Sequence, residues 1–235
     1  MFSAKDLQQI QQRNSDPAGV AVQVAQFRSG FPFLDVARAA SPGAGILRLD
    51  PTEADRYVSA YDQPVTRKDV VKFVPASGAP SRMFKDPYAF MNQYDGSAAA
   101  QQAFEADKRP QSMYSFFQRL PDFAFYDDLK AALGGEAALA ALLEAREYGK
   151  ILAALLESPG LNYGNLPKGL LKFHRYENGA RTPLEEHLVE GALYARGAGN
   201  VVRIHLTVSP EHRERFEARL KAVVAVYEKA HQVRF

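Results

Sequence analysis

The chain has 235 residues, of which 46% are hydrophobic and 24% are charged, and its formal net charge is +2. This composition is typical of a globular protein with one large domain or two small ones, and the near-neutral charge gives no electrostatic reason to expect a nucleic-acid or membrane partner. No apolar run approaches the length of a transmembrane helix, and the lack of cysteine excludes disulfides, thiolate nucleophiles and zinc–thiolate sites. The first residues are too polar for a signal peptide, so we expect a cytoplasmic protein.

The first 65 residues predict helices. Asp16 and Pro17 supply the N-cap and the first position of one helix, and the sequence DPTE at residues 50–53 has the Asp, Pro and Glu of a capping signature. Apolar residues at helical spacing follow both starts. We therefore expect residues 1–65 to form a helical segment that packs on the core of the protein.

The strongest strand signal is the β-branched sequence DVVKFV at residues 69–74, which runs directly into the loop PASGAPSRM. A strand, a loop of small residues and then a helix is the order found in phosphate-binding turns, where backbone N–H groups at a helix N-terminus hold the anion. The residues expected to bind phosphate are Ala76, Ser77, Gly78, Ala79, Ser81, Arg82 and Lys85.

After this loop, apolar residues recur at helical intervals and predict an all-helical insert over residues 86–165. Strand and helix signals then alternate, with an extended sequence at 169–174, a capping box TPLE at 182–185 and a strand at 200–208. The final residues, QVRF, are typical of the start of another strand. This order predicts an α/β fold over residues 66–235, with a mostly parallel sheet and helices on both faces.

The small-residue loop resembles the A-G-G-x-G-T-R-M loop of nucleotidyltransferases that make nucleotide sugars. The matching residues are Ala76, Gly78, Arg82 and Met83, with Ser81 in place of threonine. Ser77 and Pro80 stand where that family has glycines, and Pro80 removes one backbone N–H that would have been available to a phosphate oxygen.

A second resemblance to the same enzymes lies further along the chain. The pair Pro167–Lys168 precedes an extended sequence and the helix sequence TPLEEHLVEGAL at residues 182–193, and the strand at 201–208 follows in the order that this superfamily has. Together the loop, the Pro–Lys pair and the helix imply a fold of the nucleotide-diphospho-sugar transferase type.

The whole chain also resembles a bacterial family of unknown function with this type of fold. The carriers are GFPFL at residues 30–34, KFVPASG at 72–78, RMFK at 82–85 and RTPLEEH at 181–187. Members of that family are expected to be longer than this chain. We therefore interpret the chain as the N-terminal half of such a protein, with an α/β domain that is incomplete.

The resemblance implies roles for two cations. Nucleotidyl transfer depends on positioning and on neutralising phosphate charge, with little covalent chemistry by the protein. Arg82 would present a fork of donors to phosphate oxygens and Lys168 a point charge, so these two are the expected catalytic residues. The resemblance also implies Mg²⁺ as a cofactor, but no aspartate occupies the position expected for its ligand, and the metal ligands stay unassigned.

The predicted function is a nucleotidyltransferase-like protein that binds a nucleoside triphosphate or a nucleotide sugar. Its enzymatic form would be Mg²⁺-dependent sugar-phosphate nucleotidyl transfer. One alternative is a non-catalytic protein of the same fold that holds a phosphorylated ligand, which Ser77 and Pro80 favour. Another is a helix-mediated interaction protein built on residues 86–158. The expected partner is a nucleotide or sugar phosphate; the sequence does not define the base, the sugar or the oligomeric state.

Three further polar residues are weaker candidates. Lys72 is more typical of a solvated surface cation than of a phosphate ligand. Thr207 and Ser209 follow the end of a predicted strand, where open α/β sheets bind ligands, although Ser209 also fits the N-cap of the next helix. The histidines of the chain have no metal-ligand spacing.

Overall fold

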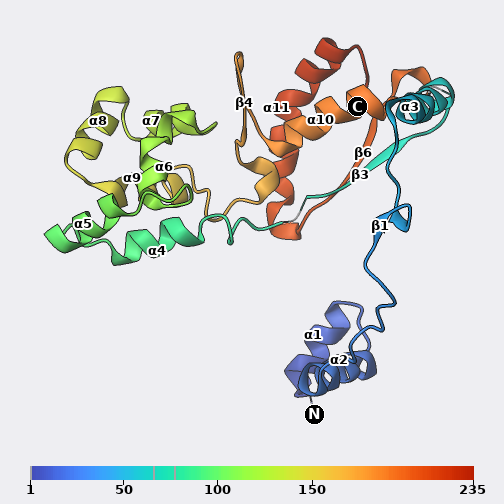
Figure 1. Ribbon diagram of the computed structural model, residues 1–235, viewed down its shortest axis with the longest axis horizontal. Helices are drawn as coiled ribbons and strands as arrows, with labels where there is room; N and C mark the ends of the chain where they lie inside the picture. Colours follow the sequence, from blue (N-terminus) through green and yellow to red (C-terminus); the bar gives the residue numbers. More distant parts are fainter. Residues whose placement is uncertain (1, 66, 77) are drawn as a thin grey trace. The chain divides into compact units, whose positions relative to one another are not determined.

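The computed structural model describes residues 2–65, 67–76 and 78–235 (Figure 1). The chain divides into two compact units, an N-terminal unit, Met1–Asp55, and a C-terminal unit, Arg56–Phe235. No helix in the described ranges is long and apolar enough to cross a membrane.

The N-terminal unit contains two helices and two very short strands. These elements are α1 (Ala4–Gln12), α2 (Pro17–Ser29), β1 (Ser41–Pro42) and β2 (Gly45–Ile46). The helix predicted to begin after Asp16 is present, and the Asp16 carboxylate accepts a hydrogen bond from the Gly19 N–H at 2.8 Å. Neither helix contains a buried residue. The packing of residues 1–65 on the core stays a prediction.

Helix α3 (Pro51–Val65) connects the two units. Its start has the predicted capping interactions, because the Asp50 carboxylate accepts from the Glu53 N–H at 2.9 Å and the Asp50 N–H donates to the Glu53 carboxylate at 3.3 Å.

Residues 85–166 of the C-terminal unit form a helical subdomain. Its helices are α4 (Lys85–Gln93), α5 (Ala98–Ala106), α6 (Met113–Gln118), η1 (Leu120–Asp122), α7 (Tyr126–Ala132), α8 (Glu136–Glu144) and α9 (Tyr148–Leu156). The apolar face of α9 is fully buried at Ile151, Leu152, Leu155 and Leu156. The same core contains the buried aromatic residues Phe104 of α5, Phe117 of α6 and Phe125. This segment therefore has its own hydrophobic core.

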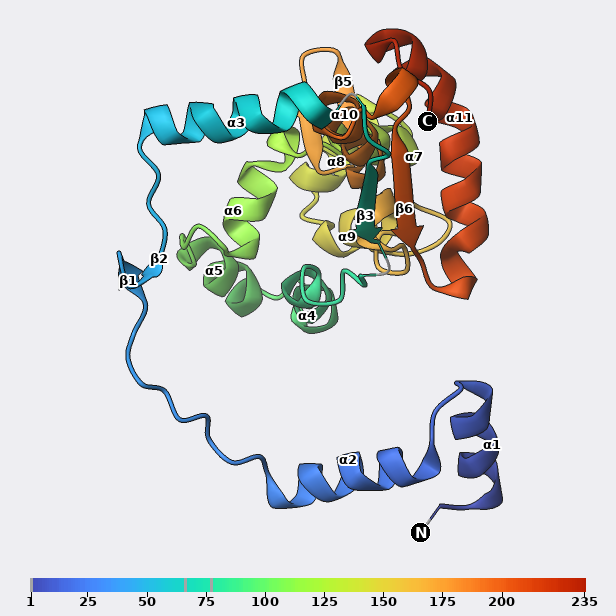
Figure 2. The same cartoon turned by 90° about the vertical axis from the view of Figure 1, so that its right-hand side faces the viewer.

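The strands predicted around residues 69–74 and 200–208 are present and pair with each other. Strands β3 (Val71–Pro75) and β6 (Arg203–Thr207) are parallel, in register from Val71 opposite Arg203 to Pro75 opposite Thr207 (Figure 2). Helices α10 (Pro183–Tyr194) and α11 (Arg213–His231) complete this part, whose core contains Val74, Leu184 and Phe216. The last residues run parallel to the start of β6, where Val202 donates to the Arg234 carbonyl at 2.8 Å.

The structure is thus a mixed α/β protein, but the predicted sheet is much smaller than expected. In the described ranges every sheet has two strands, and β3–β6 is covered by helices on one face only. On the other face the side chains of Val71 and Phe73 are 57% and 63% exposed. A mostly parallel sheet with helices on both faces is therefore not seen in these residues.

The extended sequence at residues 169–174 also differs from its prediction. The chain forms a short 3-10 turn, η2 (Lys168–Leu170), and then an antiparallel hairpin of β4 (His174–Tyr176) and β5 (Gly179–Arg181). The physical reason is the turn sequence Asn178–Gly179, since Gly179 has φ of 130°, a conformation that residues with a side chain rarely adopt. A hairpin turn at this point prevents the segment from continuing as a central parallel strand.

Candidate functional site

The predicted phosphate loop begins at the carboxyl end of β3. The Ala76 N–H donates to the Thr207 carbonyl at 2.9 Å, so the loop leaves from the point where both parallel strands end. Ser77 lies outside the described residues. The loop turns at Pro80, which is buried and accepts from the Met83 N–H at 2.8 Å, and α4 then begins at Lys85. Open α/β sheets bind ligands at this end of their strands.

The predicted Lys168 segment lies against this loop. The Lys168 N–H donates to the Gly78 carbonyl at 3.0 Å, and Pro167 before it is fully buried. Gly169 packs on Phe216, because a Cβ atom at Gly169 would be 2.9 Å from Cζ of that ring. We call residues 78–85 and 167–169 the loop pair. The structure brings together Gly78 and Lys168, which are far apart in the sequence.

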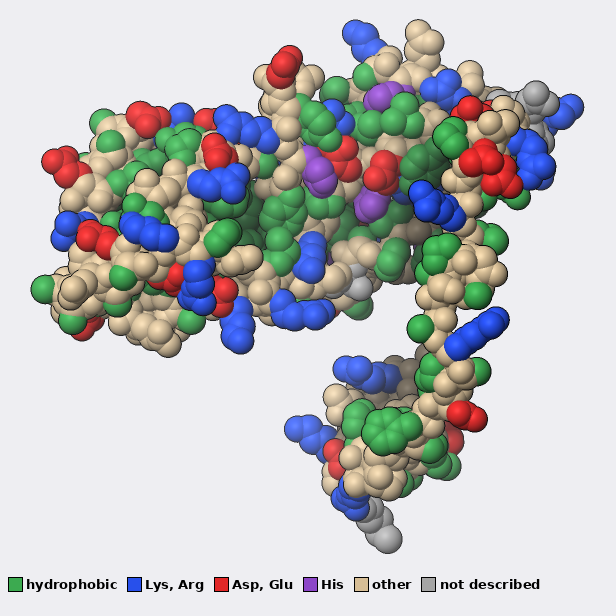
Figure 3. Space-filling view, viewed as in Figure 1, with side chains coloured by type: hydrophobic (Ala, Val, Ile, Leu, Met, Phe, Trp, Pro, Cys, Tyr) green, Lys and Arg blue, Asp and Glu red, His purple; other side chains and the backbone are tan. Residues whose placement is uncertain are grey.

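The loop pair carries three exposed cations, Arg82, Lys85 and Lys168. Among the described residues, no carboxylate lies within ion-pair distance of any of them. Charged side chains of both signs are otherwise interspersed over the face shown in Figure 3. Cations without a carboxylate partner are groups that commonly bind phosphate.

The start of α4 supplies backbone donors to the same region. Its N-cap residue, Phe84, makes no side-chain capping bond. The N–H groups of Lys85 and Asp86 therefore have no capping acceptor, and the helix dipole is positive here. Asp86 places one carboxylate in this first turn, which partly offsets the three cations.

The end of β6 borders a cavity, and no residue of the loop pair is among those that line it. A cavity of about 500 Å³ lies along residues 205–208 and the first turns of α11. Phe216 lines this cavity and also contacts Gly169, so the cavity and the Lys168 turn share one wall. A volume of this size is in the range of small-molecule sites.

The expected Mg²⁺ site stays a prediction. In the part of the chain that the structure describes, there is no group of three or more His, Asp or Glu side chains placed to hold a metal ion. The metal ligands therefore stay unassigned.

The weaker sequence candidates have structural roles. The Lys72 side chain is only 8% exposed; it forms an ion pair with Glu190 and lies 4.8 Å from the centre of the Tyr194 ring. Ser209 precedes the short turn η4 (Pro210–His212), and His205 stacks on Phe73 at 4.9 Å on the exposed face of the strands. Lys72 and His205 therefore contact neighbouring elements, whereas Ser209 occupies the N-cap position of η4 without a side-chain capping bond. Of the weaker candidates, only Thr207 contacts the predicted loop, through the carbonyl described above.

The RTPLEEH sequence at residues 181–187 forms a buried polar network that extends beyond the predicted capping box. Thr182 and Glu185 do make that capping box, and Glu185 is 5% exposed. Its carboxylate also accepts from Arg219 at 2.8 Å and from the Tyr227 hydroxyl at 3.1 Å, both on α11. The sequence contained no signal for these two partners, because nothing local in α11 marks them.

The network shifts the pKa values of its members. Burial, followed by the neighbouring Glu185 carboxylate, raises the pKa of Tyr227 to about 12. Burial acts to raise the pKa of Glu185, but hydrogen bonds from Thr182 and Arg219 outweigh it and hold that pKa below its ordinary value. Glu185 is thus a buried carboxylate that stays ionised and ties α10 to α11.

The architecture and the loop pair define an α/β protein with an inserted helical subdomain and a basic loop at the carboxyl end of its parallel strands. Residues 3–235 match the family described as Domain of unknown function (DUF4301), and the chain belongs to that family. This confirms the resemblance to a family of unknown function. No curated protein and no solved structure matches the chain. The interpretation as an N-terminal half has no support from these comparisons.

Proposed function

We propose that this protein binds a phosphorylated ligand, a nucleoside triphosphate or a nucleotide sugar, at the loop pair. The observation that carries the proposal is the 3.0 Å hydrogen bond from the Lys168 N–H to the Gly78 carbonyl. It joins the two segments that the resemblance to nucleotidyltransferases selects, and it places Lys168 beside the loop that contains Arg82 and Lys85. Phosphate oxygens would bind to these cations and to the free N–H groups at the start of α4.

The order of elements supports a nucleotide-diphospho-sugar transferase type of fold within this proposal. Strand β3, the small-residue loop, the Pro167–Lys168 turn, helix α10 and strand β6 follow one another as in those enzymes, and β3 and β6 are parallel. The helical subdomain is inserted between the loop and the turn.

The proposed reaction is attack of a sugar-phosphate oxygen on the α-phosphorus of a nucleoside triphosphate. A new phosphorus–oxygen bond forms as the bond to the β-phosphate breaks, and pyrophosphate leaves. Arg82 would bind the departing phosphates through its planar fork of donors, and Lys168 would neutralise charge on the α-phosphate. Both cations stabilise charge that increases in the transition state, so both contribute to rate and to binding.

Non-catalytic binding is the second candidate function. Pro80 takes one donor out of the loop, and its own carbonyl is occupied by the Met83 N–H. The described residues also lack a ready group of metal ligands. A protein of this kind would hold the phosphorylated ligand without turnover. The third candidate, an interaction protein built on the helical subdomain, would not depend on Arg82 or Lys168 at all.

Calorimetric titration tests the proposal. The wild type, Arg82→Ala, Lys168→Ala and the control Lys229→Ala would be titrated with nucleoside triphosphates, nucleotide sugars and sugar phosphates, with and without Mg²⁺. Lys229 is exposed near the far end of α11, so its substitution removes the same charge away from the loop pair.

We expect saturable binding that each of the first two variants weakens about 10-fold to 100-fold, since a charged hydrogen bond contributes roughly 1.5–3 kcal/mol. The control should bind like the wild type. Equal affinities in all four proteins, or no binding of any ligand, would refute the proposal. Release of pyrophosphate from a triphosphate and a sugar phosphate would separate the enzyme from the non-catalytic alternative.

A further inference from the structure

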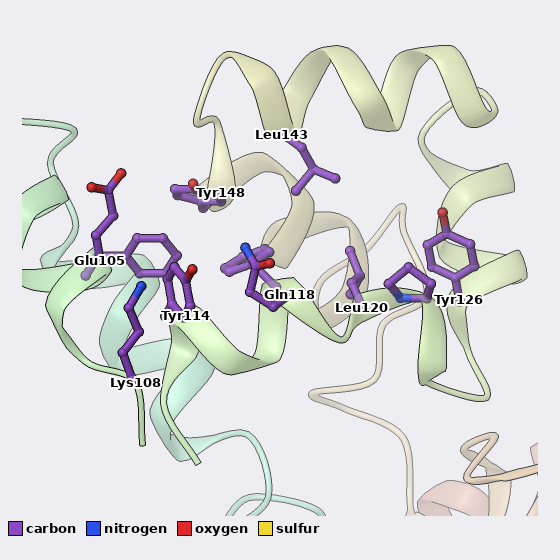
Figure 4. A pocket seen from close by; sticks show the side chains of 11 residues that line it. Glu105, Lys108, Tyr114, Gln118, Leu120, Tyr126, Leu143 and Tyr148 are labelled. Atoms are coloured by element: carbon purple, nitrogen blue, oxygen red, sulfur yellow. The ribbon is translucent and has the colours of Figure 1, made fainter. Parts of the chain in front are cut away.

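The helical subdomain contains a pocket that the loop pair does not use. Its volume is about 500 Å³, within the range of small-molecule sites. Its floor consists of buried side chains: Phe104, Phe117, Leu120 and Tyr148. Figure 4 shows Lys108 beside Tyr114 at one end of the pocket, Gln118 in the middle, and Leu120 and Tyr126 at the other end.

The aromatic rings of the pocket hold one another in place. Tyr148 lies 4.7 Å from Phe104 and 4.6 Å from Phe117, measured between ring centres. Tyr114 meets the edge of Phe104 at 5.6 Å. Because each ring contacts at least one other, the shape of the floor is fixed before a ligand arrives, which lowers the entropy cost of binding.

One end of the pocket carries the cation Lys108 and the carboxylate Glu105. The Lys108 ammonium lies 3.3 Å from the centre of the Tyr114 ring, and no carboxylate in the described ranges is within ion-pair distance of it. The neighbouring carboxylates already have cationic partners. Glu105 is 3.6 Å from Arg146, and Asp107 is 2.6 Å from Arg109. Lys108 is therefore the cation at this pocket that is available to an anion from outside the protein.

From this arrangement we infer that the pocket binds a small planar aromatic ring that carries one anionic group. The ring lies on the aromatic floor, and the anionic group contacts the Lys108 ammonium next to Tyr114. The Gln118 amide, at the rim, offers one donor group and one acceptor to polar substituents of the ring. This site is separate from the loop pair, and it does not depend on the proposed function.

The lack of tryptophan in the chain allows a direct test. Indole-3-acetate can be excited at wavelengths that the tyrosines of the chain do not absorb, so its fluorescence anisotropy reports binding without a contribution from the protein. Tryptamine has the same ring with a cationic group in place of the anionic one, and acetate has the anion without the ring. Each probe would be titrated with the wild-type chain, Lys108→Ala, Tyr114→Ala and the control Lys150→Ala, an exposed lysine of α9 that pairs with Glu147.

We expect indole-3-acetate to bind with a dissociation constant of about 1 mM or below, from the usual affinity per ligand atom. Tryptamine should bind at least about tenfold more weakly, and acetate should not compete. Lys108→Ala should weaken indole-3-acetate binding about tenfold and remove its advantage over tryptamine, while the control Lys150→Ala should bind both indoles like the wild type. Tyr114→Ala should weaken both indoles, since both use the ring surface.

Three results would overturn the inference: no saturable binding of indole-3-acetate, equal binding of the two indoles to the wild type, or unchanged affinity in Lys108→Ala. Lys108 is exposed, so its substitution does not threaten the fold, and a thermal melt of each variant checks this. Competition by adenosine monophosphate would identify a nucleotide as the natural source of the ring and anion. Indole-3-acetate binding without that competition would identify an aromatic carboxylate.

Discussion

Gly169 packs closely against the core residue Phe216, and its substitution by alanine tests how the loop pair is held. A Cβ atom at this position would be 2.9 Å from Cζ and 3.0 Å from Cε1 of Phe216, and 3.8 Å from the Ala76 carbonyl oxygen. The Phe216 ring is buried and only 3% exposed. Either the turn that contains Lys168 or the Phe216 ring, which lines the cavity at the end of β6, must therefore shift to make room for the new methyl group.

The cost follows from this overlap. Ordinary carbon–carbon contact is at about 3.5–4.0 Å, so the turn or the ring has to move by roughly 0.5–1 Å. Overpacking of a well-packed core costs about 1–3 kcal/mol, and we expect Gly169→Ala to reduce the free energy of unfolding by that amount. For a unit of this size, the melting temperature should fall by about 2–4 °C per kcal/mol. A shift of the turn would also strain the hydrogen bond between the Lys168 N–H and the Gly78 carbonyl.

The assay is urea denaturation of the wild type, Gly169→Ala, Phe216→Leu and the double variant. The smaller leucine leaves space for the methyl group, so the double variant should lose at least about 1 kcal/mol less than the sum of the two single losses. Gly149→Ala is the matched control, because a Cβ atom there meets nothing within 4 Å. Close packing of Gly169 on Phe216 is refuted if Gly169→Ala is as stable as the wild type. It is also refuted if the loss of unfolding free energy in the double variant equals the sum of the losses in Gly169→Ala and Phe216→Leu.

Three further changes have defined outcomes. Leu152→Ala removes a fully buried side chain of the helical subdomain, and it should cost about 2–5 kcal/mol of unfolding free energy in urea titrations. Arg219→Ala leaves the buried Glu185 carboxylate without its cation, and we expect it to lower the free energy of unfolding by about 1–3 kcal/mol near neutral pH. This loss should shrink as pH falls below the ordinary pKa range of a glutamate, because the lowered pKa of Glu185 contributes stability only where Glu185 is ionised in the unfolded chain. Tyr227 should ionise near pH 12 in a spectrophotometric titration, together with Tyr163, whose pKa is also raised to about 12, so Tyr227→Phe should lower the amplitude of that step by one tyrosine. The raised pKa of Tyr227 contributes stability that is complete below pH 10 and is lost as pH rises to about 12.

The parts of the fold that depend on short-range chemistry were predictable. Capping boxes act within four residues, so the helix starts at Asp50 and Thr182 follow from the sequence alone. The strands β3 and β6 are marked by β-branched runs bounded by loops. The hairpin of β4 and β5 was missed although Asn178–Gly179 is a turn signal, because the apolar residues before it favoured a longer strand. Local patterns gave no measure of how many strands the sheet would have.

The candidate site was only partly predictable for the same reason. The residues of the small loop and Lys168 were selected by resemblance, and neither periodicity nor spacing shows that a lysine so distant in sequence hydrogen-bonds to Gly78. The pairing of Glu185 with Arg219 and Tyr227, and the meeting of Lys108 with the aromatic floor of its pocket, depend on how helices pack. Such packing is decided by the three-dimensional fit of side chains that are far apart in the chain.

The loop pair also connects the two hydrophobic cores of the C-terminal unit. The helical subdomain and the strands have separate hydrophobic cores, the first with Phe84 and Leu171 at its margin and the second with Ala76. The chain leaves the strands through the loop after Ala76 and returns through the turn at Lys168, and the hydrogen bond to Gly78 ties these two crossings together. An anion held by cations from both crossings would add to that connection. The proposed binding at the loop pair would therefore be coupled to the stability of the join between the two cores, in the way that any ligand stabilises the state that it prefers.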